Sequence, residues 1–97
     1  MDSTYEIHGT TFVWDEDKAR ANLAKHGVSF EVAATVFFDP FVRVADASRN
    51  EEARDAAIGY DDYQRLLCVV YLEVEDDYIR IVSARSASNQ ERRKYDR

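Results

Sequence analysis

Residues 78–97 read YIRIVSARSASNQERRKYDR, and this stretch decides how the chain ends. Its first part, Tyr78 to Arg85, is apolar and rich in β-branched residues, which favours a strand. Ser88 is followed three residues later by Glu91, the capping-box pattern of a helix N-terminus. The stretch therefore predicts a strand, a short Ser/Ala turn and a terminal helix that carries Arg92, Arg93, Lys94 and Tyr95.

Charge is distributed unevenly along the chain. Residues 80–97 hold 6 Lys/Arg against 2 Asp/Glu, whereas residues 2–79 hold 7 against 17, for a net charge of −6. A basic end on an acidic body indicates a phosphate site or contact with a partner's acidic patch. The acidic body disfavours sequence-independent coating of DNA, which depends on many cationic contacts.

Upstream of this stretch, from Phe41 onward, the spacing of the apolar residues is typical of β-strands. Strands are predicted at 41–44, 54–60 and 65–73, with acidic turns at Asp61-Asp62 and Glu75–Asp77 that we expect to be solvated hairpin tips. The strand at 65–73 is apolar on both faces, which predicts a central position in a sheet. Together with the strand at 78–85, these segments predict an antiparallel meander of about four strands.

Two helices are predicted before the meander, after β-prone fragments at 5–8 and 11–14 that fit either a short hairpin or one bent strand around Gly9. Asp15 is a suitable N-cap for a helix that runs to about His26 and ends at Gly27. Its residues Ala19, Leu23 and His26 fall on one stripe, which we expect to face the core. Ser29 caps the second helix, in which Phe30, Ala33, Ala34 and Phe37 recur at helical spacing and which ends at Asp39-Pro40.

The element order predicts one α+β domain over residues 1–97, with the two N-terminal helices packed on one face of the antiparallel sheet and the C-terminal helix following it. Cys68 stands in an apolar run, which favours a buried, inert thiol. The chain shows neither a signal peptide nor an apolar stretch near 18 residues, so we expect a cytoplasmic protein without membrane contact.

A cationic constellation is the best candidate for chemistry. His8 and His26 have no metal-ligand spacing, and the 3 glycines form no phosphate loop, so neither a metal nor another cofactor is expected. Metal-free RNA cleavage needs a base, an acid and cations that stabilise charge on the phosphate. Histidine, arginine, lysine and tyrosine suit these roles, and the chain offers them at Lys25, His26, Arg65, Arg80, Arg85, Arg92, Arg93, Lys94 and Tyr95.

Simpler explanations exist for the same residues. His26 at a helix end favours the negative pole of the helix dipole whether or not it is catalytic. Arg80 pairs with an acid on a neighbouring strand in a purely structural interpretation. Arg92 and Arg93 then belong to a solvated helix face.

Several motifs together resemble those of one known family. They are WDEDKARANLAKHGVSFEVA at 14–33, VFFDP at 36–40, RLLCVVY at 65–71 and IRIVSARSA at 79–87, followed by Glu91-Arg92-Arg93 and Tyr95. This series is similar to the BrnT family of bacterial type II toxins. The resemblance implies a RelE-like fold, a ribonuclease activity that arrests translation, and neutralisation by a BrnA-like ribbon-helix-helix antitoxin. Operator DNA would then be bound only through the antitoxin complex.

The resemblance also assigns roles to the cations. It places Lys25, His26, Arg65, Arg85 and Tyr95 in the catalytic site, with the arginines on the scissile phosphate, His26 or Lys25 in proton transfer and Tyr95 positioning RNA. Arg80, Arg92 and Arg93 would bind the RNA backbone. Ser86 stands where similar sequences often have lysine. Two alternatives stay open: a module that only binds the antitoxin, and a DNA-binding regulator.

Overall fold

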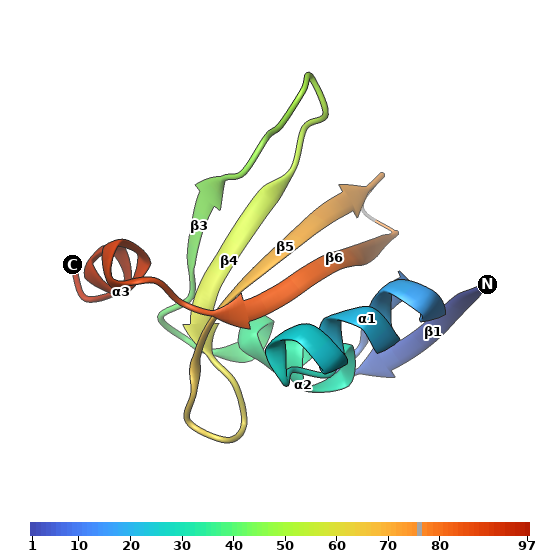
Figure 1. Ribbon diagram of the computed structural model, residues 1–97, viewed down its shortest axis with the longest axis horizontal. Helices are drawn as coiled ribbons and strands as arrows, with labels where there is room; N and C mark the ends of the chain where they lie inside the picture. The colour runs from blue at the N-terminus through green and yellow to red at the C-terminus, as the bar shows by residue number, and fades with distance from the viewer. Residues whose placement is uncertain (76) are drawn as a thin grey trace.

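The computed structural model describes residues 1–75 and 77–97, and within them a mixed sheet of six strands is flanked by helices (Figure 1). The elements follow in the order β1 (Asp2–Ile7), β2 (Thr10–Asp15), α1 (Glu16–His26), α2 (Phe30–Ala34), the 3-10 helix η1 (Thr35–Phe38), β3 (Arg43–Asp46), β4 (Asp55–Tyr60), β5 (Leu66–Val74), β6 (Tyr78–Ser86) and α3 (Asn89–Tyr95). The strand order in the sheet is β1-β2-β6-β5-β4-β3. The α+β class is confirmed.

The sheet is larger than predicted and is not wholly antiparallel. β3 to β6 form the expected meander, but the N-terminal fragments pair as the hairpin β1–β2, and β2 joins β6 in parallel at Phe12↔Ile79 and Val13↔Arg80. The four-stranded meander is thus present, but the prediction that it makes up the whole sheet was wrong. Phe12 and Trp14 on β2 are 0% and 4% exposed, and an isolated hairpin has too little core to bury them.

The predicted helix ends are confirmed. The Asp15 carboxylate accepts the N–H of Lys18, and Gly27 closes α1 in the left-handed conformation with φ 69°. Ser29 caps α2, which continues into η1. Ser88 begins α3 with the predicted capping box. Each of these capping interactions joins residues three or four positions apart, so it can be predicted from the sequence alone.

The sheet buries a core on each face. Under α1 and α2 lies the larger one, to which β5 contributes Leu67 and Val69; on the other face, Leu66 and Cys68 of β5 pack with Ala56, Ile58, Tyr60, Ala87 and Tyr95. Figure 1 shows α3 on the side of β3 and β4, away from α1 and α2. Alternate residues of β5 thus serve both cores, which confirms the prediction that this strand is central.

Ala19 packs against the larger core as predicted, but the rest of the core-facing stripe predicted for α1 was wrong. Leu23 is 51% exposed and His26 is exposed, whereas Asn22 is buried. Asn22 donates to the carbonyls of Val28 (3.0 Å) and Ala84 (2.8 Å), and its oxygen accepts the N–H of Ala84 (3.0 Å). β2 pairs with β6 only as far as Arg80. Beyond that point, the Asn22 amide makes the hydrogen bonds to the β6 backbone that a neighbouring strand would otherwise make. Apolar periodicity does not detect a buried amide of this kind.

The predicted hairpin tips differ from one another. Asp61 is buried rather than solvated, since its carboxylate accepts the backbone N–H groups of Tyr63 and Arg65. Asp62 is exposed, as predicted. Of the turn predicted at 75–77, Asp76 lies outside the described residues.

No helix in the described part of the chain has the length and apolar character needed to cross a membrane.

Candidate functional site

Three segments meet at the end of the sheet where β6 finishes and β5 begins. Leu67 pairs with Ser86, and the N–H of Ala87 donates to the carbonyl of Leu66 at 2.9 Å. The Asn22 amide ties α1 to Ala84, directly before Arg85. The last turn of α1, the first residues of β5 and the last residues of β6 therefore lie at the same end of the sheet, where they carry candidate residues on both of its faces.

Lys25 and His26 occupy the last turn of α1, and both are exposed. The final carbonyls of a helix lack backbone partners and carry partial negative charge, which favours cations at this position. Both side chains are therefore accessible to a ligand at this end of the sheet.

Arg65 lies beside this helix corner and is held on several sides. Its Nε donates to Asp61 Oδ2 at 2.8 Å, and its Nη1 donates to the carbonyl of Gly27 at 3.4 Å. The guanidinium carbon also stands 5.8 Å from the ring centroid of Tyr63, within cation–π range. Because the Asp61 side chain is fully buried and that of Arg65 is 42% exposed, the guanidinium is oriented from below and open to solvent above.

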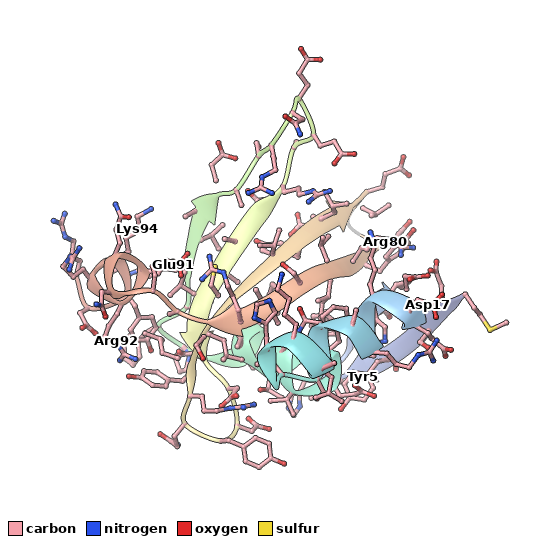
Figure 2. All side chains as sticks on the ribbon, in the orientation of Figure 1. Tyr5, Asp17, Arg80, Glu91, Arg92 and Lys94 are labelled. Atoms are coloured by element: carbon pink, nitrogen blue, oxygen red, sulfur yellow. The ribbon has the colours of Figure 1, made fainter. Side chains whose placement is uncertain are left out.

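Arg85 points to the opposite face of the sheet, toward α3. Its Nη1 and Nη2 donate to the two carboxylate oxygens of Glu91 at 2.8 and 2.9 Å, and its side chain is 42% exposed. The hydrogen bonds from Arg85 lower the pKa of Glu91 to about 2, against the opposing effect of burial. Figure 2 shows Glu91 on the side of α3 that faces the sheet. An anion at Arg85 would share this guanidinium with Glu91.

Cys68 pairs with Arg85 across the strands but does not supply a nucleophile. Burial, together with the negative charge of Glu91, raises the pKa of its thiol to about 11. The thiol is therefore protonated at neutral pH, as predicted for an inert buried cysteine.

Tyr95 is one helical turn beyond Glu91 and is fixed at both ends. Its hydroxyl donates to Asp39 Oδ2 at 2.6 Å, and its ring packs edge-on against Tyr60 with centroids 5.3 Å apart. Burial and the bond to Asp39 raise the pKa of Tyr95 to about 12, so the hydroxyl keeps its proton at neutral pH. Tyr95 is therefore not a base, and its single O–H donor is already bonded to Asp39.

Asp39 is a residue of this region that sequence reasoning assigned only to a helix end. Its carboxylate accepts three bonds, from Tyr95 and from the backbone N–H groups of Tyr60 (2.8 Å) and Phe41 (2.9 Å). Burial raises the pKa of Asp39, but these three bonds together outweigh it and leave the pKa below its usual value. Asp39 thereby joins η1, β4 and α3.

The remaining cations are dispersed. Arg80 pairs with Asp2 at 2.7 Å, and five residues along β6 separate it from Arg85 by roughly 17 Å. The bonds to Asp2 raise the pKa of Arg80, with burial opposing them. Arg92 and Arg93 are exposed on α3, and Figure 2 shows Arg92 and Lys94 on opposite sides of that helix.

The candidate residues therefore fall into two groups. Lys25, His26 and Arg65 lie together at the helix corner, while Arg85 and Tyr95 lie on the face covered by α3, and Arg80 belongs to neither. Within residues 1–75 and 77–97, no three His, Cys, Asp or Glu side chains are grouped as metal ligands.

Comparison with known proteins identifies the family to which the chain is similar. Residues 14–91 match the model of the family described as "Ribonuclease toxin, BrnT, of type II toxin-antitoxin system". The crystal structure of the Brucella abortus ribonuclease toxin BrnT is similar, with a TM-score of 0.62 and 28% sequence identity, over 78% of this chain and 94% of the Brucella chain. A sequence comparison with curated proteins finds no match.

Proposed function

The chain belongs to the BrnT family of ribonuclease toxins of type II toxin–antitoxin systems, and from this premise we propose that it is a metal-independent endoribonuclease that arrests translation. We further propose that its layout is RelE-like and that it acts in the cytoplasm. The observation that carries the proposal is the Arg65 guanidinium, oriented by buried Asp61 and open to solvent beside exposed Lys25 and His26. Phosphodiester cleavage requires a fixed cation that stabilises charge on the phosphate and nearby side chains that transfer protons.

The reaction we propose is in-line attack by the ribose 2′-hydroxyl. One of His26 and Lys25 takes the proton from the 2′-hydroxyl, the 2′-oxygen bonds to phosphorus as the bond to the 5′-oxygen breaks, and the other side chain gives a proton to the departing 5′-oxygen. The products are a 2′,3′-cyclic phosphate and a free 5′-hydroxyl. Arg65 binds the scissile phosphate at the helix corner, Arg85 binds RNA phosphate oxygens at the same end of the sheet but on its other face, and the ring of Tyr95 positions the RNA.

The outer cations have supporting roles in this proposal. Exposed Arg92 and Arg93 attract the RNA backbone and contact the antitoxin. Arg80 contributes less to RNA binding because Asp2 compensates its charge. The partner is a BrnA-like ribbon-helix-helix antitoxin, and operator DNA is bound only through the complex.

The test uses purified protein without antitoxin, incubated with RNA in EDTA. We expect fragments that end in 2′,3′-cyclic phosphate, and we expect Arg65→Ala and Arg85→Ala to lose at least about a hundredfold in rate, because each removes a cation that holds the phosphates of the RNA. The matched control is Arg20→Ala, which removes an equally charged, exposed residue from α1. Cleavage by Arg85→Ala at the control's rate contradicts the assignment.

A second candidate function is a module that only binds the antitoxin and supports repression of the operon. The bidentate bond between Arg85 and Glu91 favours it, because a compensated arginine attracts phosphate less strongly. Expression of the toxin without its partner distinguishes the two functions. Arrest of growth supports the ribonuclease, and unimpaired growth together with intact antitoxin binding supports the module.

A further inference from the structure

A hollow of about 370 Å³ lies on the face of the sheet that carries Arg85. It is lined by three arginines from separate segments and by two hydroxyl groups, namely Arg49, Arg54, Arg85, Ser48 and Ser83. Of these residues, the catalytic assignment uses only Arg85. The hollow is therefore a cationic feature that the proposed chemistry does not explain.

Strand alternation accounts for the shared face. Arg54 stands two residues before Ala56, which packs in the core next to α3, so both side chains point to this face. Ala56 pairs with Val70, which pairs with Ser83, and Ser83 stands two residues before Arg85. Val70 forms the floor between the arginines of β6 and of the segment that enters β4.

Arg54 has incomplete hydrogen bonding. Its Nη2 donates to Glu52 Oε2 at 2.7 Å, but its Nε is buried and has no acceptor among the described residues. A buried donor without an acceptor is unfavourable. Glu52 is 66% exposed, so solvent screens its pairing with Arg54 and leaves much of the cationic field in the hollow.

Arg49 is held over the hollow by a tight turn. It exchanges two backbone hydrogen bonds with Glu52, at 3.1 and 2.9 Å, while Asn50 and Glu51 have φ of 50° and 67°, as in a type I′ turn. Ser48 Oγ accepts the backbone N–H of Arg54 at 3.3 Å, which closes the loop below the turn. Within residues 1–75 and 77–97, no carboxylate lies within 4 Å of the Arg49 guanidinium.

We propose that this hollow, the Arg49–Arg54 subsite, binds a phosphodiester group of the RNA backbone next to the phosphate held by Arg85. Guanidinium groups from three segments, with the hydroxyl of Ser83, supply donors from several directions, whereas the Ser48 hydroxyl donates to Asp46 at 2.5 Å and only shapes the loop. That arrangement suits a tetrahedral phosphate better than a planar carboxylate. The inference rests on the proposed ribonuclease function, which it deepens by adding a contact beyond the scissile bond.

The first test measures binding of an uncleavable 2′-O-methyl RNA oligonucleotide by fluorescence anisotropy across a KCl titration. For Arg49→Ala and Arg54→Gln, we expect an affinity loss of about three- to tenfold and a salt slope smaller by about 0.7 for each variant, because each loses one phosphate contact. Arg20→Ala, which removes the same charge from a distant exposed position, is the control. Equal affinity and slope in Arg49→Ala and Arg20→Ala overturn the subsite.

The second test separates failure of the subsite from failure of the ribonuclease proposal. Arg49→Ala should cleave a dinucleotide, which has a single phosphate, at the wild-type rate and a longer oligonucleotide more slowly. If the wild-type protein cleaves neither substrate but Arg49→Ala still weakens oligonucleotide binding, the subsite holds and the catalytic proposal fails. If Arg49→Ala impairs binding of the antitoxin and leaves RNA binding unchanged, the hollow is a protein contact and the subsite is overturned.

Discussion

Replacing Asn22 with alanine tests the connection that holds the helix corner against β6. The substitution removes three hydrogen bonds, which contribute about 1 kcal/mol each, and leaves the buried N–H of Ala84 without an acceptor, which costs about 1–3 kcal/mol. Some of the loss overlaps, so we expect the free energy of unfolding to fall by about 3–4 kcal/mol. For a domain of this size, that lowers Tm by roughly 12–30 °C.

Urea denaturation followed by Trp14 fluorescence measures this change. Trp14 is the single tryptophan, and only 4% of it is exposed, so its emission reports loss of the larger core. Asn89→Ala is the control, because Asn89 is an exposed asparagine at the start of α3, where alanine is well tolerated in a helix. The control should stay within about 0.5 kcal/mol of wild type.

A second variant distinguishes the hydrogen bonds from the volume of the side chain. Asn22→Asp keeps the shape and the acceptor but removes both donors and buries a charge next to two carbonyl groups. It should therefore be at least as destabilising as Asn22→Ala. If Asn22→Ala loses less than about 1 kcal/mol, or if Asn22→Asp is as stable as wild type, the amide does not hold α1 to β6 as argued.

Three further perturbations have defined outcomes. The pKa of Glu91 is about 2 in the fold against 4.5 for the free group, so its stabilisation is present above pH 4.5 and is lost as the pH falls toward 2. After a discount for the exposed Arg85 side chain, that loss is about 1–2 kcal/mol. Urea titrations at pH 7, 5 and 3 should show it in wild type and not in Glu91→Gln; parallel pH profiles would refute it. Glu51 has φ 67°, so Glu51→Gly should raise the free energy of unfolding by about 0.5–1 kcal/mol in the same assay, and a loss would contradict the turn geometry. Tyr95→Phe removes the bond to Asp39 and should cost about 1–1.5 kcal/mol, while RNA cleavage falls less than in Tyr95→Ala if the ring positions the RNA. Equal cleavage by the two variants would remove Tyr95 from the site.

Sequence predicted those parts of the fold that depend on neighbouring residues. The helix caps at Asp15, Ser29 and Ser88 each bond an N–H three residues ahead, and the apolar run of β5 identifies a central strand by itself. The parallel pairing of Phe12 with Ile79 joins residues far apart in the chain, and neither fragment signals it locally. Local patterns therefore predict the helices and strands, whereas the pairing of β2 with β6 is known only from the structure.

The candidate site shows the same division. Lys25, His26 and Arg65 were selected by residue type and by family resemblance, and the structure places them together. Two residues that hold the region together, Asn22 under the helix corner and Asp39 under Tyr95, were missed because neither side chain stands in a distinctive local pattern. Asn22 reaches 62 residues along the chain and Asp39 reaches 56, so no pattern of spacing connects them to their partners.

The net charge of −6 is compatible with phosphate binding because the acids accompany the arginines individually. Arg65 pairs with Asp61, Arg85 with Glu91 and Arg54 with Glu52. A carboxylate uses one or two of the five guanidinium donors and fixes the arginine side chain. Less conformational entropy of that side chain is then lost when it binds a phosphate. Pairing therefore weakens the long-range attraction of RNA but orders the donors at the surface. An acidic protein of this design should bind RNA slowly and position it well, and its affinity should depend on local contacts more than on net charge.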